Sequence, residues 1–454
     1  MYIYILLAFF VIALVVSYFI FNKEIMQPAI IFCTAYMLSV LCATVNITKW
    51  NINMDLKTFL ILALGAVEFI VISYLIFIFM KKKTIPSNQE KEKIIKTPKW
   101  IIVFLIIYNI IVIGLLLYNV LNIASQFGTY SSFSQALTIY KEHTSYSNDT
   151  ELPDYLTILM KPIISMAYIG IFIFANNTIY SDEKFKLRIL KNSYYLVFPL
   201  IYIFQRLIES NRGSILNLCV GAIAMAIMIW SIKNDWKKHI KLKIITMLFI
   251  AACIELIIFY YCAPLIGRIN NKKMFDYITF YVGGSIECFN QWLKNPTTPD
   301  VVPGEYTFAR TINDLNKLGM TKYTLNNENY SKFVYYKDTA VGNVYTSYRS
   351  WMHDWGIGGI IVLQAILAIV INALYNFIKY SNKFKNYMIL IYGYIIYVIF
   401  MHPIDSYFYL EFFTIANIAA IIIMTIIYYV LINYRKILQY LDKLRKEKRI
   451  CQKN

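Results

Sequence analysis

Charged residues are scarce in this chain of 454 residues: they make up 15% of it, whereas 59% of the residues are hydrophobic. This balance excludes an ordinary soluble domain. The seven cysteines are scattered through apolar stretches, so the chain lacks the disulfide framework found in small secreted proteins. The composition is typical of a polytopic membrane protein.

Motifs for metals and nucleotides are also missing. The four histidines stand at 143, 239, 353 and 402 without close ligand spacing, which predicts no metal site. The sequence has neither a Gly-rich phosphate loop nor a G-x-S-x-G nucleophile motif, so a nucleotide-driven catalytic domain is not expected. It indicates no cofactor, and the energy for any reaction must come from the substrate itself.

What the chain has in quantity is apolar runs long enough to cross a hydrocarbon core about 30 Å thick. They lie at about 2–21, 28–47, 58–80, 100–121, 158–180, 192–209, 213–232, 244–262, 355–378, 386–401 and 410–432. The first run follows no basic residue and precedes no small-x-small cleavage site, so we expect it to be retained. An all-α fold with 11 transmembrane helices is predicted.

The basic residues predict the orientation of these helices. The formal net charge is +18, but most Lys and Arg lie in short blocks between apolar runs, at 81–99, 184–191, 233–243, 379–385 and 435–453. Such blocks stay in the cytoplasm, and their position argues against a nucleic-acid partner. We therefore expect a cytoplasmic C-terminus, an N-terminus outside, and membrane lipids around the helices.

These runs and blocks divide the chain into four predicted segments. Residues 1–262 hold the first eight helices, 263–354 form a large outer loop, 355–432 hold the last three helices, and 433–454 form a basic cytoplasmic tail. Because the outer loop is the one long polar segment between apolar runs, we expect the functional site there.

Two short helices are expected inside the outer loop. Residues 276–294 have apolar residues at roughly helical spacing, although the pair Gly283 and Gly284 weakens this prediction. Three prolines and a glycine at 295–304 exclude regular structure, and a second helix is expected at 305–318. A Tyr- and Asn-rich linker follows, and aromatic and amide side chains of this kind suit sugar faces and hydroxyls.

Three local motifs stand out on this layout. Arg212 and Gly213 begin an apolar run, YVGGSIECFN occupies 281–290, and NVYT at 343–346 is followed by DWGIGG at 354–359 at the start of the next run. Together they resemble the O-antigen polymerases, which join oligosaccharide repeat units. The resemblance covers the helix layout of nearly the whole chain.

The resemblance implies a metal-independent, inverting glycosyltransferase of the bacterial inner (plasma) membrane that works in lipopolysaccharide or a related surface polysaccharide synthesis. Polyprenyl-diphosphate-linked repeat units would be both donor and acceptor, on the outer face of the membrane. A chain-length regulator protein is a candidate partner.

Such a reaction needs cations for the diphosphate leaving group. The candidates are Arg206, Arg212, Arg268, Arg310 and Arg349, because guanidinium groups bind phosphate through two parallel hydrogen bonds. Arg212 is favoured, since Gly213 lets a phosphate approach the backbone and the free N–H groups at a helix start add positive charge. The alternative is an arginine that extends to lipid headgroups. Tyr345 is a further candidate for binding the substrate.

The reaction also needs a base for the acceptor hydroxyl, and the candidates are His353, Asp354 and His402. Histidine titrates near neutral pH, whereas a carboxylate needs burial to do so. On a helix, Arg349 and His353 would share one face, with Asp354 turned about 100° away. We therefore favour His353 as the base and expect Asp354 to orient the loop or cap the helix through residues 343–346. A structural role remains the alternative for each.

Two other classes of function stay open. An O-antigen ligase would share the helices and the large outer loop but transfer the finished chain to lipid A core. A flippase or transporter would be expected to place charged residues along a central cavity and to have short loops, whereas polar residues here gather in the outer loop.

Overall fold

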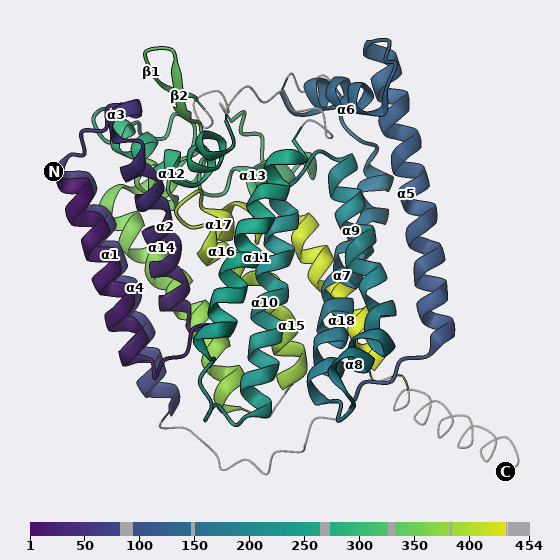
Figure 1. The fold of residues 1–454 in the computed structure, drawn as a ribbon. Coiled ribbons are helices and arrows are strands. Elements are labelled where there is room, and N and C mark those ends of the chain that lie inside the picture. Colours follow the sequence, from purple (N-terminus) through teal and green to yellow (C-terminus); the bar gives the residue numbers. More distant parts are fainter. Residues whose placement is uncertain are drawn as a thin grey trace, which may run out of the picture. The chain divides into compact units, whose positions relative to one another are not determined.

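The computed structural model describes residues 1–81, 94–146, 150–263, 273–325, 332–381, 384–432 and 434. Almost every element is a helix (Figure 1). The chain divides into two compact units, each assembled from segments far apart in the sequence. The first unit comprises Met1–Asn88, Asn234–Cys262 and Asn270–Asn417, and the second comprises the rest.

The first unit contains most of the predicted outer loop together with the helices on both sides of it. Its helices are α1 (Tyr2–Ile20), α2 (Pro28–Val45), α3 (Ile47–Trp50), α4 (Leu56–Lys81), α11 (Leu242–Tyr261), α12 (Met274–Trp292), α13 (Ala309–Lys317), α14 (Ser347–Tyr380), α15 (Lys385–Ile395), α16 (Tyr397–Phe400) and α17 (Tyr407–Glu411). An antiparallel hairpin joins β1 (Val334–Tyr336) to β2 (Thr339–Gly342).

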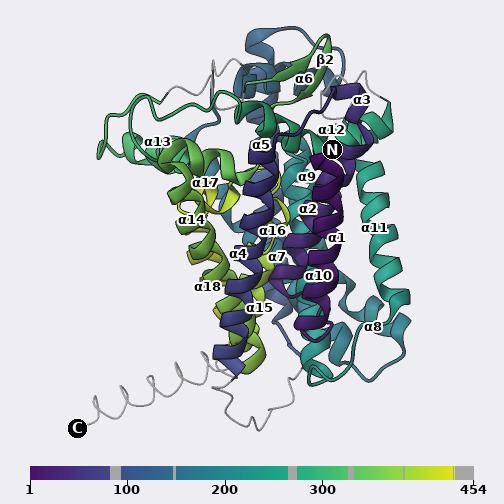
Figure 2. The ribbon, with the colours of Figure 1, turned by 90° about the vertical axis from the view of Figure 1, so that its left-hand side faces the viewer.

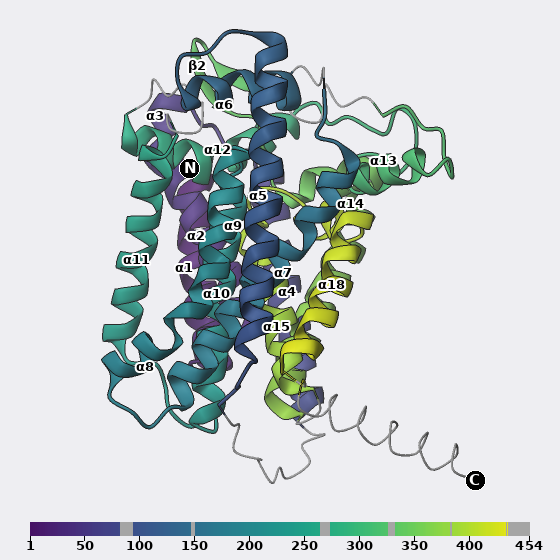
Figure 3. The ribbon, with the colours of Figure 1, turned by 90° about the vertical axis from the view of Figure 1, so that its right-hand side faces the viewer.

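Every secondary-structure element in the described residues of the second unit is a helix. Its elements are α5 (Lys99–Phe127), α6 (Phe133–Lys141), the π-helix η1 (Glu142–Tyr146), α7 (Asp154–Tyr180), α8 (Phe185–Asn192), the 3-10 helix η2 (Ser193–Leu196), α9 (Val197–Ile208), α10 (Gly213–Lys233) and most of α18 (Ile415–Ile432). Within this unit α6 and α8 lie at opposite ends of the long helices (Figure 3).

Among the described residues, eight helices are long and apolar enough to cross a membrane: α1, α2, α4, α5, α7, α10, α14 and α18. The prediction of an all-α membrane protein is confirmed at this level. The other predicted spans coincide with α9, which has 12 residues, with α11, which has 20, and with the short apolar stretch Lys385–Phe400. The count of 11 stays a prediction.

The first helix shows why such segments belong in lipid. Its buried face carries Leu6, Phe10, Ala13 and Ser17 at three- and four-residue spacing, as expected for one side of a helix. The opposite side exposes large apolar residues such as Phe19, which is 63% exposed. A helix that is apolar on all sides has no face suited to water, so its outer face requires a hydrocarbon environment.

The polar elements of the first unit gather at one end of its helices. The N-terminus, α3, α12 and the β hairpin lie at that end, and the end of α14 and the start of α15 lie at the other (Figures 1 and 2). This grouping agrees with a shared side for the N-terminus and the 263–354 segment. Which end faces outward stays a prediction. The predicted tail at 433–454 lies outside the described residues except for Tyr434.

Helix α12 confirms the helix predicted at 276–294 and explains its two glycines. A Cβ added to Gly283 would lie 2.6 Å from the backbone nitrogen of Ala43, and one added to Gly284 would lie 2.2 Å from the carbonyl oxygen of Val341. Both positions therefore require glycine for close packing, against α2 and β2. The pair counted against the prediction of a helix, yet the helix forms, because tertiary packing outweighs intrinsic helix propensity.

The 295–304 segment has no helix or strand, as its prolines predict. The second helix of the loop is shorter than the predicted 305–318: α13 begins at Ala309, because the residues before it are held by hydrogen bonds to other parts of the unit. The β1–β2 hairpin was not predicted, since the sequence around it indicated a linker.

Candidate active site

Three candidate residues of the outer loop, Arg349, His353 and Asp354, lie on a short helical segment at the start of α14. This helix begins at Ser347 but is interrupted at Trp355 (φ −139°, ψ 17°) and Gly356 (φ 63°, ψ −153°). The positive φ of Gly356 is strained for any residue with a side chain. Residues 347–354 therefore form a separate pair of turns ahead of the apolar part of the helix.

Arg349 and His353 do share a face of these turns, as their spacing predicts, because both contact the ring of Tyr306. The His353 ring stacks on Tyr306 with centroids 3.7 Å apart and an interplanar angle of 10°. The guanidinium carbon of Arg349 lies 4.9 Å from the Tyr306 centroid and 3.9 Å from that of Tyr345. The result is a stack of Tyr345, Arg349, Tyr306 and His353, in which cation–π contacts hold the arginine.

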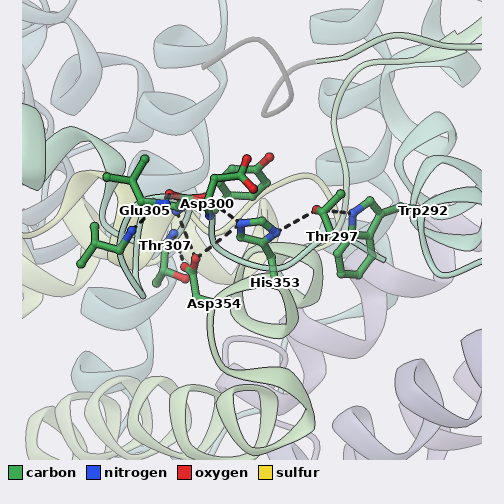
Figure 4. Close-up of polar contacts among 10 residues, drawn as sticks. Trp292, Thr297, Asp300, Glu305, Thr307, His353 and Asp354 are labelled. Carbon is green, nitrogen blue, oxygen red and sulfur yellow. Dashed lines mark hydrogen bonds and ion pairs between the residues drawn. The ribbon is translucent and has the colours of Figure 1, made fainter. Parts of the chain in front are cut away.

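The two ring nitrogens of His353 have different partners (Figure 4). Its Nε2 lies 3.1 Å from Oε1 of Glu305, and its Nδ1 lies 2.8 Å from the hydroxyl oxygen of Thr297. The same hydroxyl accepts a hydrogen bond of 3.2 Å from the indole N–H of Trp292. His353 is only 2% exposed, whereas Thr297 is exposed, so this contact leads from a buried ring to the surface.

Glu305 determines which nitrogen of His353 carries the proton. Burial by itself raises the pKa of Glu305, but hydrogen bonds from the backbone of Asp300, Val301 and Val302 and from His353 outweigh this, and the net pKa shift is downward. An ionised carboxylate only accepts hydrogen bonds, so Nε2 of His353 must be the donor. In the neutral ring, Nδ1 then has the lone pair and accepts from the Thr297 hydroxyl.

Asp354 is next to His353 in sequence, but its side chain binds the backbone of residues 306 and 307. Its carboxylate accepts hydrogen bonds from the N–H groups of Tyr306 (3.3 Å) and Thr307 (2.8 Å) (Figure 4). Its Oδ1 lies 4.0 Å from Nε2 of His353. Asp354 does orient a loop, but the predicted route through residues 343–346 needs correction. The segment it holds is 306–307, which carries the stacking tyrosine and follows Glu305.

Both ring nitrogens of His402 have hydrogen-bond partners in the core. Its Nδ1 lies 2.8 Å from the hydroxyl of Tyr36 and its Nε2 lies 3.1 Å from Oε1 of Gln364. The amide of Gln364 donates to the carbonyl of Gly65 and the hydroxyl of Tyr348, both at 3.2 Å, so its oxygen is the acceptor and Nε2 of His402 is the donor. Nδ1 therefore accepts from Tyr36.

The surroundings of His402 are aromatic. The rings of Phe32, Tyr348 and Trp351 lie with centroids 5.0 to 5.2 Å from its own, and the side chain is 1% exposed. Burial lowers the pKa of His402 to about 3. His402 is thus a neutral residue of the helix core that ties α2 to α14.

Arg310 and Tyr345 contribute in different ways. Arg310 forms an exposed ion pair of 2.5 Å with Glu411, which fastens α13 to α17, and an exposed pair of this kind adds little stability. Tyr345 donates a hydrogen bond of 2.9 Å to the carbonyl of Lys332 and lies against Arg349. Only Tyr345 of this pair belongs to the stack that contains His353.

Arg206 and Arg212 belong to the second unit. Arg206 forms an ion pair of 2.7 Å with Glu209 and lies over the ring of Tyr202 at 4.9 Å. Arg212 is only 3% exposed and immediately precedes α10, whose first residue is Gly213. A Cβ at Gly213 would have Asn211 Oδ1 as its nearest neighbour, at 3.8 Å, so the backbone there is open to approach. Such burial is unlike that of an arginine extended to lipid headgroups. Arg268 lies outside the described residues.

Sequence reasoning missed Glu305, Tyr306 and Thr297. Glu305 and Tyr306 fell in a stretch read as a helix, and Thr297 fell in the Pro-rich break. Their partner His353 is about 50 residues further along the chain, and no local pattern reports a contact at that separation. The prolines around Thr297 and Glu305 did indicate a loop whose backbone N–H groups would need acceptors.

The fold and this cluster define an all-α, multi-pass membrane protein with a buried histidine–carboxylate pair at the polar end of one unit. Among the described residues, no group of three or more His, Cys, Asp or Glu side chains is arranged to hold a metal ion. No protein-family model, no curated protein and no solved structure matches the chain.

Proposed function

We propose that this protein is a glycosyltransferase that polymerises polyprenyl-diphosphate-linked oligosaccharide repeat units into O-antigen or a related surface polysaccharide. The reaction takes place on the outer face of a bacterial inner membrane. The observation that carries the proposal is the Glu305–His353–Thr297 relay, in which an oriented imidazole contacts an exposed hydroxyl. A general base must lie within hydrogen-bond reach of the hydroxyl whose proton it takes, and Nδ1 of His353 lies at such a distance from the Thr297 hydroxyl.

His353 acts as the general base in this proposal. As the acceptor oxygen bonds to the anomeric carbon of the donor, its proton moves to Nδ1 of His353. The bond between that carbon and the diphosphate oxygen breaks, and the diphosphate leaves with the electron pair. Glu305 then faces an imidazolium through Nε2, and its negative charge stabilises the protonated ring. Attack opposite the leaving group inverts the anomeric configuration.

Arg349 is the proposed partner of the leaving diphosphate in the first unit. The guanidinium carbon of Arg349 lies over the rings of Tyr345 and Tyr306, and these cation–π contacts hold the group in place. A fixed guanidinium stabilises developing phosphate charge without reorganisation. Arg212, which is buried in the second unit, is a separate candidate for binding phosphate. The apolar outer faces of the eight candidate spanning helices suit a lipid-linked substrate, whose tail stays in the bilayer.

Purified protein incubated with labelled lipid-linked repeat units and no lipid A core tests the proposal. A ladder of products that differ by one repeat unit is expected. Product formation only when core is added would indicate a ligase. Absence of any product, together with movement of the lipid-linked unit across proteoliposome membranes, would indicate a flippase.

Sidedness can be tested separately in a variant without native cysteines. Thr324 and Lys238 are exposed and lie in the predicted outer loop and a predicted cytoplasmic block. A membrane-impermeant thiol reagent applied to spheroplasts should label Thr324→Cys and leave Lys238→Cys unlabelled. The opposite pattern would overturn the orientation, and with it a reaction at the outer face.

A further inference from the structure

The contacts of Thr297 describe a small binding site. Its hydroxyl oxygen lies 3.2 Å from Nε1 of Trp292, which donates, and 2.8 Å from Nδ1 of His353. Since Glu305 keeps the ring proton on Nε2, Nδ1 of the neutral ring accepts. One donor and one acceptor therefore converge on the position of a single hydroxyl group, which can both accept and donate.

A third contact supports this view of the site. Burial raises the pKa of Tyr306, while the Arg349 charge and a side-chain hydrogen bond with Thr297 lower it. The ring of Tyr306 is also stacked on His353. The hydroxyl of Thr297 thus lies among Trp292, His353 and Tyr306.

The Thr297 side chain can move away from His353 without disturbing Glu305. It is exposed and lies between Pro296 and Pro299 in the 295–304 segment, which has neither helix nor strand. Glu305 is held separately, by the N–H groups of Asp300 (3.0 Å) and Val301 (2.9 Å). Rotation of Thr297 would break only its own contacts, and Nδ1 of His353 would then face the surface.

We propose that Trp292 and His353 form the subsite for the acceptor sugar hydroxyl, and that the Thr297 side chain occupies this subsite until the sugar displaces it. The inference rests on the proposed function and identifies the acceptor side of its site. The displaced and the displacing groups are both hydroxyls, so the same two contacts serve each. Trp292 is half-buried, and its ring offers an aromatic face beside the subsite for a sugar ring.

Chemical modification of His353 tests the subsite without relying on polymerisation. Diethyl pyrocarbonate acylates an unprotonated histidine nitrogen, and mass spectrometry of the full-length protein in detergent measures the rate at each histidine. Thr297→Ala should raise the rate of modification at His353 roughly five- to tenfold, because it removes one neutral hydrogen bond that must break before the nitrogen can react. Thr297→Ser is the matched control: it keeps the hydroxyl and should react at the wild-type rate. His402, engaged at both nitrogens, should react slowly in all three proteins.

In the Thr297→Ala protein, slower modification of His353 in the presence of a sugar reports sugar binding. The probes are the methyl glycosides of glucose, galactose, mannose and N-acetylglucosamine, and at least one should slow modification of His353. An equal concentration of a polyether without hydroxyl groups should not. Equal rates in the wild-type and alanine proteins would overturn the role of Thr297, and no protection by any glycoside would overturn the sugar subsite. Protection in a protein that forms no ladder would refute the polymerase alone and leave the subsite standing.

Discussion

His353 and His402 lie in the same unit, are almost equally buried, and use both ring nitrogens, yet their networks end differently. The network of His402 closes on itself inside the helices, through Tyr36 and Gln364. That of His353 runs from a carboxylate held by backbone N–H groups to an exposed threonine. Exposure of the ring does not separate the two residues, whereas the last member of each network does.

The last member of each network distinguishes a candidate general base from a structural histidine when both rings are buried. A catalytic imidazole needs one nitrogen oriented by an acceptor and the other directed to where a substrate can arrive. His353 meets both conditions once Thr297 moves. His402 meets the first through Gln364, but its second nitrogen is directed at a tyrosine in the core. Four experiments test this difference.

The largest effect is expected from His353→Ala. Loss of a general base should lower the rate of ladder formation roughly 100- to 10,000-fold, while the protein stays folded and still binds the lipid-linked substrate. An in vitro ladder assay and a detergent melting curve measure the two properties. His239→Ala, at an exposed position, is the control. An active His353→Ala beside a folded but inactive Asp354→Ala would make the aspartate the base.

The arginines come next. Arg212→Lys and Arg349→Lys keep the charge but lose the planar pair of N–H donors, so each should slow polymerisation roughly 100- to 1,000-fold if it binds the diphosphate in the transition state. Arg310→Lys is the control, because its partner is Glu411 on the surface. Ladder length and rate are compared at equal expression. Normal chains from either test variant would assign that arginine a structural role.

Asp354→Ala should lower the stability of the protein, and its activity should fall as a consequence. It removes the acceptor of the Tyr306 and Thr307 N–H groups, and we expect the free energy of unfolding to fall by about 2 to 4 kcal/mol, with activity falling alongside. Asp354→Asn keeps one acceptor oxygen, so its free energy of unfolding should lie between those of the wild type and Asp354→Ala. The melting temperature in detergent measures the loss. An alanine variant as stable as the wild type would contradict the structural role.

The smallest effect concerns pH and His402. Its folded-state pKa is lowered from 6.5 to about 3 by burial, so the unfolded chain takes up its proton first. The stability present above pH 6.5 is lost as pH falls toward 3, at about 1.4 kcal/mol per pH unit. Between pH 6.5 and pH 5 this amounts to about 2 kcal/mol. The pH dependence of unfolding is compared with that of His402→Gln, which should lack this contribution. Identical slopes would show that His402 titrates normally in the folded protein.

The pattern of apolar runs predicted the class of fold, because a segment that must satisfy all its backbone groups in lipid has little choice but to be a helix. It predicted α12 and the break at 295–304 for equally local reasons. It was less accurate where tertiary contacts compete with local preference. The helix expected from 305 starts at Ala309, since Asp354 holds the N–H groups of residues 306 and 307.

The helices, the polar loop and the shared face of Arg349 and His353 could be predicted, because each follows from the spacing of neighbouring residues. Tertiary contacts, in contrast, set which histidine has a carboxylate at one ring nitrogen and the hydroxyl of an exposed threonine at the other. Glu305 and Thr297 reach His353 across about 50 residues of chain. Contacts over such separations are selected by the packing of the whole unit, and no periodicity in the sequence encodes them.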